Sequence, residues 1–144
     1  MSIRRKSREL ALQCLYQIDQ GGNQQPDIAG MKEYFDVNQK AVSYAQELVS
    51  GIQLHWEVLN RMVEDHAKNW RLSRMAVIDR NILRIAAYEI AYMNDVPSSV
   101  ILNEAIEIAK RFSSDDAAPF INGILDSICR SIRKEENETN SGHD

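Results

Sequence analysis

The chain has 144 residues, 44% of them hydrophobic, which is enough for one domain whose core needs no disulfide or metal support. A net charge of -4 excludes binding to nucleic acid through overall positive charge. No stretch reaches the about 18 apolar residues of a membrane span, and no signal-peptide apolar run follows the basic residues 1–8. Because Cys14 and Cys129 lie in apolar helical patterns, we expect buried thiols and a cytoplasmic protein.

Apolar residues recur with helical spacing along most of the chain. The pattern predicts a first helix over residues 4–20, ended by the glycines at 21 and 22, and a short second helix over 28–35. A long third helix is predicted over 36–66, which begins with a capping box at Asp36 and bends at Gly51. Further helices are expected over 74–94, capped by Ser73 and most deeply buried, and from 98 or 99 to 112. A last helix, capped by Asp116, runs to 132.

The expected fold class is therefore all-α, a compact bundle of about six to seven helices. A single domain is predicted over residues 1–133, and an acidic, disordered tail over 134–144. Two inward rows are expected in the last two helices: Leu102, Ala105, Ile106, Ala109 and Phe112, then Phe120, Ile121, Ile124, Leu125 and Ile128. Gly123 is expected to permit close helix contact.

The chain offers little for catalysis. It has no glycine-rich phosphate loop, nucleophile elbow or paired metal-binding histidines, and His55, His66 and His143 are scattered. We therefore expect no enzyme activity, no cofactor and no metal. Glu89 falls among the isoleucines of the central helix, where a carboxylate needs an ionic or hydrogen-bonding partner. This favours a structural clamp to a neighbouring helix over a catalytic acid.

The first helix carries the clearest functional pattern. Arg5, Arg8, Leu12 and Tyr16 share one flank, with Arg4 close by. Guanidiniums at the positive end of a helix dipole suit an external polyanion, and an adjacent tyrosine offers a stacking platform for an unpaired base. The alternative is a solvated basic terminus whose tyrosine packs on the core edge, and spacing alone favours neither. The mixed charges of the later helices argue against a DNA-reading helix-turn-helix.

Three blocks of sequence resemble the NusB family of bacterial transcription antitermination factors. They are RRKSRELALQ at 4–13 continuing to LY at 15–16, ILRIA at 82–86 with YEI at 88–90, and DVP at 95–97 followed by NEAIE at 103–107 and FINGILD at 120–126. The blocks stand in family order and at family spacing. Together they span nearly the whole chain up to residue 132.

The resemblance implies two packed helical subdomains, no enzyme activity, and binding of boxA-type single-stranded RNA together with NusE, a small-subunit ribosomal protein. Other Nus factors and RNA polymerase would be reached indirectly, in support of complete ribosomal RNA transcription. The matching RNA-contact positions are Arg4, Arg5, Lys6, Arg8, Tyr16, Asp116 and Phe120, and Asp79 matches an acidic position facing NusE. Ser113 and Pro119 depart from the family's usual glycine and lysine, and the second change removes a possible phosphate contact.

Two alternatives remain open at this stage. One is a module that binds only a protein partner, and the other is an accessory helical domain of an RNA methyltransferase. The resting state is equally open, because the family includes monomers and homodimers. If about four cations meet single-strand phosphates, the salt dependence of RNA binding should have a slope of roughly -3.

Overall fold

The computed structural model describes residues 3–21, 38–68 and 70–133. Within these ranges it contains six α-helices, one short 3-10 helix and no strand, which confirms the all-α prediction. The expected helix over 28–35, the cap at Asp36 and the tail over 134–144 lie outside the described residues. None of the described helices is long and apolar enough to cross a bilayer.

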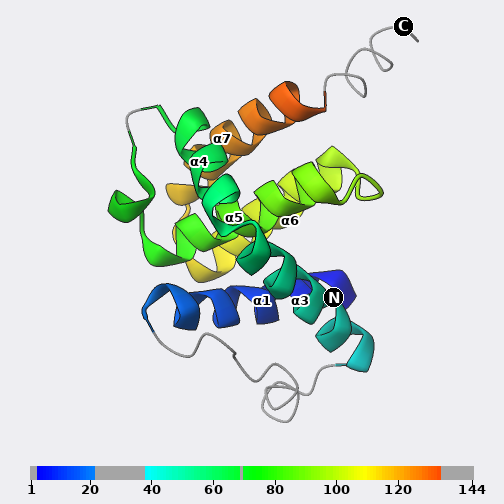
Figure 1. Cartoon of the computed structure of the whole chain (residues 1–144). Helices are drawn as coiled ribbons and strands as arrows, with labels where there is room; N and C mark the ends of the chain where they lie inside the picture. Colours follow the sequence, from blue (N-terminus) through cyan, green and yellow to red (C-terminus); the bar gives the residue numbers. More distant parts are fainter. Residues whose placement is uncertain (1–2, 22–37, 69, 134–144) are drawn as a thin grey trace, which may run out of the picture.

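The helices form two packed groups (Figure 1). The first group contains α1 (Ile3–Asp19) and α3 (Gln39–Leu54), which lie against each other. The second contains α4 (Trp56–His66), α5 (Val77–Tyr92), α6 (Ser98–Phe112) and α7 (Ala117–Ile132). Helix α5 packs against every other described α-helix, so it is the centre of the fold, as its apolar circumference predicted.

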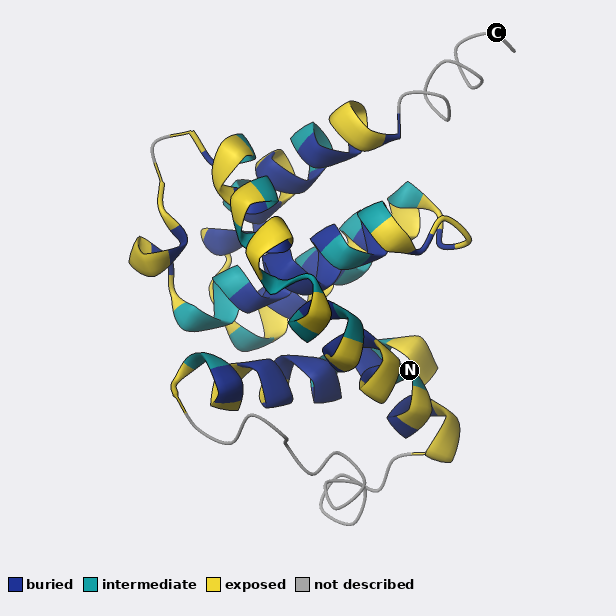
Figure 2. Cartoon of the chain, in the orientation of Figure 1, coloured by how far each residue is buried: buried dark blue, intermediate teal, exposed yellow. Residues whose placement is uncertain are grey.

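Helix α1 is amphipathic and buries one side against the bundle (Figure 2). Cys14 and Leu15 are fully buried on that side, and the Ser7 hydroxyl donates a 2.8 Å hydrogen bond to the carbonyl of Ala41 in α3. The helix ends where Gly21 adopts a φ of 77°, a left-handed conformation that glycine accepts without strain. The thiols of Cys14 and Cys129 are both buried, as expected.

The prediction of one long third helix is wrong, because this segment forms two helices, α3 and α4. Asn38 opens α3, its side chain accepting a hydrogen bond from the amide of Lys40, and the chain breaks at His55 before α4 begins. Gly51 remains helical and admits the phenol of Tyr88, whose hydroxyl occupies the space that a β-carbon would take. The glycine therefore provides a close approach between α3 and α5.

Three other details differ from expectation. Ser73 belongs to the 3-10 helix η1 (Leu72–Arg74), and α5 begins only after Ala76, because this turn reverses the chain first. In α6 the buried residues are Ile101, Ala105, Ile108 and Ala109, of which only the two alanines belong to the predicted row. Gly123 is exposed, and no atom lies within 4 Å of the position that a β-carbon would take, so it permits no close contact.

The beginning of α7 and its buried row follow the prediction more closely. Helix α7 starts directly after Asp116, but the Asp116 side chain makes no capping bond, and the hydroxyl of Ser114 accepts from the Ala117 amide instead. Four of the five predicted inward residues are buried, while Phe120 is half-buried. Pro119 sits in the first helical turn, where a proline costs no hydrogen bond.

Candidate nucleic-acid interface

The amino-terminal turns of α1 place four cationic side chains in different environments. Arg4 has 46% of its side chain exposed, lies 4.8 Å from the centre of the Tyr44 ring, and approaches Asp95 at 3.8 Å. This exposed ion pair is weak, because water and salt screen it. Arg4 is therefore held over an aromatic ring while its charge stays accessible to an external anion.

Arg5 and Lys6 are half-buried beside Arg4. The Nε of Arg5 donates a 2.5 Å hydrogen bond to Glu104 of α6, and this bond is the largest cause that raises the pKa of Arg5. A phosphate could displace Glu104 because the guanidinium side chain keeps 32% of its surface exposed. Arg4, Arg5 and Lys6 are thus at least partly exposed, with Arg5 already engaged by a carboxylate.

Arg8 differs from the expectation, because its guanidinium belongs to the core. Its side chain is 3% exposed, and Nε and Nη2 donate two 2.7 Å hydrogen bonds to the two carboxylate oxygens of Glu89. The hydroxyl of Tyr44 also donates to Glu89 at 3.3 Å, and burial raises the pKa of this tyrosine. Direct contact between Arg8 and RNA does not fit this geometry. The structural clamp predicted for Glu89 is present.

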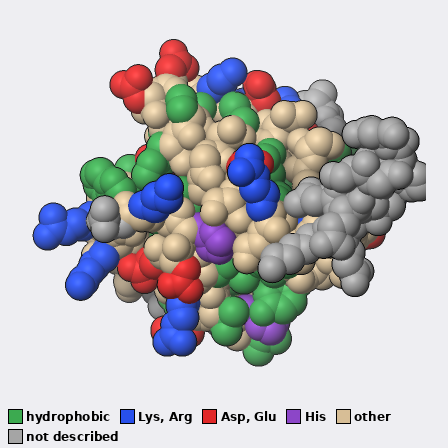
Figure 3. All heavy atoms as spheres, turned by 90° about the horizontal axis from the view of Figure 1, so that it is seen from above, with side chains coloured by type: hydrophobic (Ala, Val, Ile, Leu, Met, Phe, Trp, Pro, Cys, Tyr) green, Lys and Arg blue, Asp and Glu red, His purple; other side chains and the backbone are tan. Residues whose placement is uncertain are grey.

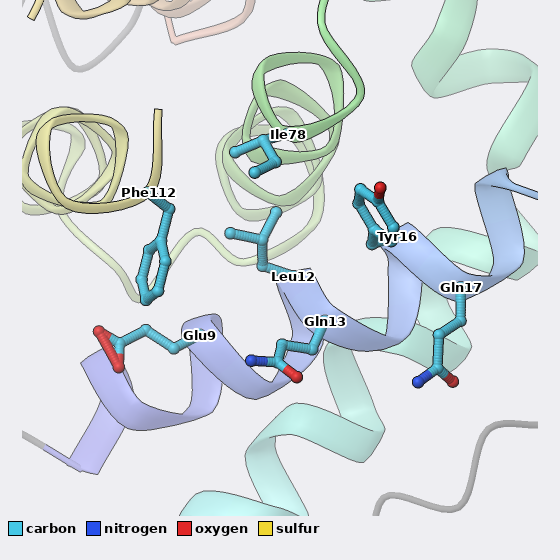
Figure 4. Close-up of a pocket in the computed structure, with 7 residues that line it drawn as sticks. All are labelled: Glu9, Leu12, Gln13, Tyr16, Gln17, Ile78 and Phe112. Atoms are coloured by element: carbon cyan, nitrogen blue, oxygen red, sulfur yellow. The ribbon is translucent and has the colours of Figure 1, made fainter. Parts of the chain in front are cut away.

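Tyr16 lies at the edge of a surface hollow of about 240 Å³ between α1, α5 and α6 (Figure 4). The ring is 45% exposed. Tyr16 and Leu12 point from α1 toward Ile78 of α5, and Phe112 of α6 points toward the same space. An exposed aromatic ring beside an apolar hollow can stack with a planar ligand such as a base.

The remaining predicted residues meet in a second hollow, of about 280 Å³. Asp79 at the start of α5, Asp116 before α7 and Phe120 in the first turns of α7 all line it. Trp70 packs edge-on against Phe120, with 6.0 Å between ring centres. The Oδ1 atom of Asp79 is the one fully buried side-chain nitrogen or oxygen of the described residues that lacks a hydrogen-bond partner. Such an atom can accept a donor that another molecule provides.

The two hollows are neighbours on the surface. Ile78 lines the first and Asp79 the second, and the end of α6 contributes Phe112 to the first while Ser114, just beyond it, lines the second. The predicted residues, Arg8 excepted, therefore fall into two sets: the amino-terminal cations with Tyr16 on α1, and the three residues that line the second hollow.

Sequence reasoning missed several residues of this surface. Phe112 was expected to point inward, and Arg111 resembled a solvated charge, although its Nη1 donates a 3.0 Å hydrogen bond to Glu9 of α1. Trp70 and Arg74 line the second hollow and lie in a segment without helical periodicity. Trp70 is 51% exposed, and this exposure identifies it as a surface residue of the hollow. Exposure depends on the fold, so the sequence alone could not predict it.

The wider surface carries charges of both signs. Figure 3 shows basic and acidic side chains interspersed over the face seen from above. No group of three histidine, cysteine, aspartate or glutamate side chains among the described residues is placed to hold a metal ion.

Comparisons with known proteins identify relatives of this chain. The transcription antitermination protein NusB of Desulfotalea psychrophila is 44% identical over 135 residues, covering 89% of this chain and 96% of that protein. Among solved structures, NusB of T. maritima has a TM-score of 0.80 at 32% identity, covering 94% of this chain and 96% of its own. A complex of the antitermination factors NusB and NusE with double-stranded RNA contains a chain with a TM-score of 0.78 at 25% identity, covering 91% and 98%.

Fold and surface thus define an all-helical protein of the antitermination class. The NusB family profile matches residues 5–130, and the chain belongs to the NusB family.

Proposed function

We propose that this protein is a transcription antitermination factor that binds boxA-type RNA together with NusE. Membership of the NusB family supports the proposal, as does the structural similarity to a protein solved in complex with NusE and RNA. In this role the protein regulates transcription of ribosomal RNA in the cytoplasm, reaching other Nus factors and RNA polymerase through the assembly. Its action is binding, without a catalytic step.

One observation carries the RNA-binding role: an exposed tyrosine and an arginine-bearing flank occupy the same helix. Tyr16 offers an accessible ring beside a hollow, and Arg4, Arg5 and Lys6 lie in the first turns of α1. The first turn contains no acidic residue, so the positive end of the helix dipole adds to the side-chain charges. RNA phosphates can meet the cations while one base stacks on Tyr16.

The second hollow is the proposed contact with NusE. Asp79 lines this hollow, and its carboxylate, whose Oδ1 has no donor among the described residues, would accept a hydrogen bond from NusE. Asp116 and Phe120 line the same hollow and would lie where RNA and protein partner meet. Because RNA and NusE would occupy neighbouring parts of one surface, each should strengthen the binding of the other.

The test is a titration of labelled boxA-like RNA, single- and double-stranded, with and without NusE. Tyr16→Ala should weaken binding about 5- to 150-fold, the range for loss of one stacked base, whereas Tyr16→Phe should bind like the wild type. Tyr92→Ala is the matched control, because Tyr92 has a similar exposure of 42% on α5 away from this surface. Unchanged affinity of Tyr16→Ala would refute the proposed site.

Salt dependence gives a second test. With Arg8 in the core, three cations remain on the flank, so the slope should be roughly -2 instead of the -3 expected for four. Raising salt from about 50 to 200 mM should then weaken binding about 20-fold. Partner binding without any RNA effect would instead favour the protein-only module.

A further inference from the structure

A third hollow, of about 400 Å³, lies away from the proposed RNA surface. Ile18, Asp19, Gln53, Trp56 and Arg84 line it, so it is formed by the end of α1, the junction of α3 and α4, and the middle of α5. It shares no lining residue with the hollows of Tyr16 and Asp79. Its volume suits a small ligand.

Buried charges beside this hollow do not balance. Asp19 faces two guanidiniums, those of Arg80 and Arg84, at 2.6 and 2.7 Å. The carboxylate is 8% exposed, and the two arginines are 14% and 5% exposed. One carboxylate against two guanidiniums leaves one positive charge in excess among the described residues. An excess buried charge is costly unless an anion accompanies it.

Hydrogen bonding locates the excess on Arg84. Arg80 donates from each of its three nitrogens, to both oxygens of Asp19 and to the carbonyl of Leu72. In Arg84, Nε donates to Asn60, and Nη1 donates to Asp19 and Asn81. The two N–H groups of Nη2 have no acceptor among the described residues.

The side chain of Arg84 keeps 5% of its surface exposed. Since Arg84 lines the third hollow, this is the space its free donors can reach. The ring of Trp56 lies 4.0 Å from the guanidinium carbon and fixes its plane. Burial lowers the pKa of Arg84, in line with a charge that lacks full compensation.

We propose that the hollow beside Arg84 binds a small oxyanion, such as a phosphate group, through the unpaired Nη2 donors. The planar guanidinium presents two N–H groups in a fixed orientation that matches an oxyanion. A single negative charge would neutralise the network. Free phosphate and the phosphate of a nucleoside monophosphate share this chemistry, and the experiment distinguishes them.

The experiment follows thermal unfolding and the Trp56 indole N–H resonance during titration with sodium phosphate. Sodium chloride at equal ionic strength is the reference, and uridine monophosphate and sodium acetate are parallel arms. A Trp70→Phe variant identifies the Trp56 signal. Wild-type protein should show saturable binding, and at ten times the dissociation constant the folding equilibrium should shift about tenfold, which raises the melting temperature by about 5 °C. Stronger binding of uridine monophosphate would identify a nucleotide as the ligand, and equal binding would identify free phosphate.

Gln53→Glu is the decisive variant, because it places a carboxylate on the wall of the hollow without removing any bond of Arg84. It should bind phosphate about tenfold or more weakly. Gln46→Glu is the matched control: it makes the same charge change on an exposed position of α3. Arg84→Gln should also lose binding.

Two results would overturn the inference. One is a response to phosphate no larger than the response to chloride, which would leave an adventitious ion only. The other is equal phosphate binding by the Gln53→Glu and Gln46→Glu variants. Affinity for boxA-like RNA should be the same in both variants, so failure of this site is distinguishable from failure of the proposed function.

Discussion

Arg8 and Glu89 form a bidentate ion pair in the interior, with 3% and 1% of their side chains exposed. The pair joins α1 to the central helix α5, across 81 residues of sequence. It helps to set the orientation of α1, in which Arg4 and Tyr16 face outward. The basic motif at the amino terminus therefore divides into exposed cations and one internal anchor.

Removing one partner of this pair should destabilise the fold strongly. Arg8→Ala leaves the Glu89 carboxylate buried without its counter-ion, which should lower the free energy of unfolding by about 3–5 kcal/mol. The double variant Arg8→Met, Glu89→Leu should recover most of this loss. Urea denaturation followed by circular dichroism measures both. A loss below about 1 kcal/mol in the single variant would contradict the role of the pair.

Two glycines should respond to alanine in opposite directions. Gly51→Ala forces the phenol of Tyr88 out of its position, at an expected cost of about 1–3 kcal/mol. Gly123→Ala meets open space on a helix and should stabilise by about 0.5–1 kcal/mol. In a Tyr88→Ala background the Gly51→Ala change should become neutral or stabilising. Thermal unfolding of the wild type, the two glycine variants, Tyr88→Ala and the double variant tests these expectations. A destabilising Gly123→Ala would show that this position is packed.

Low pH should remove the contribution of Asp19 to the free energy of unfolding. Its hydrogen bonds from Arg80, Arg84 and Asn81 outweigh burial and hold the pKa of Asp19 below its usual range. An unfolded aspartate titrates near about 3.9, so the stabilisation is complete above that pH and is lost as the pH falls through the lower folded value. Asp19→Asn should therefore be less stable at neutral pH, and the difference from wild type should shrink below about pH 4. Unfolding curves between about pH 2 and 7 give the measurement.

Neutralising Glu104 should strengthen RNA binding. Glu104 accepts the hydrogen bond of Arg5 that a phosphate would have to replace. Glu104→Gln removes that competing charge and should raise affinity for boxA-like RNA about threefold, with a larger gain at low salt. Glu57→Gln on the exposed face of α4 is the control for net charge. Equal gains in the two variants would point to general electrostatics instead of the Arg5 contact.

Periodicity predicted much of the fold because most helices bury one clear stripe. It located α1, the start of α6 and the end of α7 to within a residue or two. It failed where a decision depended on a neighbour: the chain break at His55 is set by packing between helix groups, and the exposure of Gly123 depends on what lies opposite. Neither feature has a local sequence signal.

The site was predictable to a similar extent. Helical spacing and the family resemblance placed Tyr16 on the surface of α1, and the structure shows it exposed beside a hollow. The burial of Arg8 escaped that reasoning, because a helical wheel assigns a flank and cannot show that α5 delivers a carboxylate there. The unbalanced charge of Arg84 was equally invisible, since its neighbours come from four separate segments.

Arg133, directly after α7, is 7% exposed and donates hydrogen bonds to the carbonyls of Glu89, Ile90, Met93 and Val96. These acceptors belong to the end of α5 and the turn after it, some forty residues earlier in synthesis. During translation those carbonyls emerge long before the guanidinium that satisfies them. The central helix therefore reaches its final hydrogen-bonded state only after Arg133 has been made, well after its own last residue.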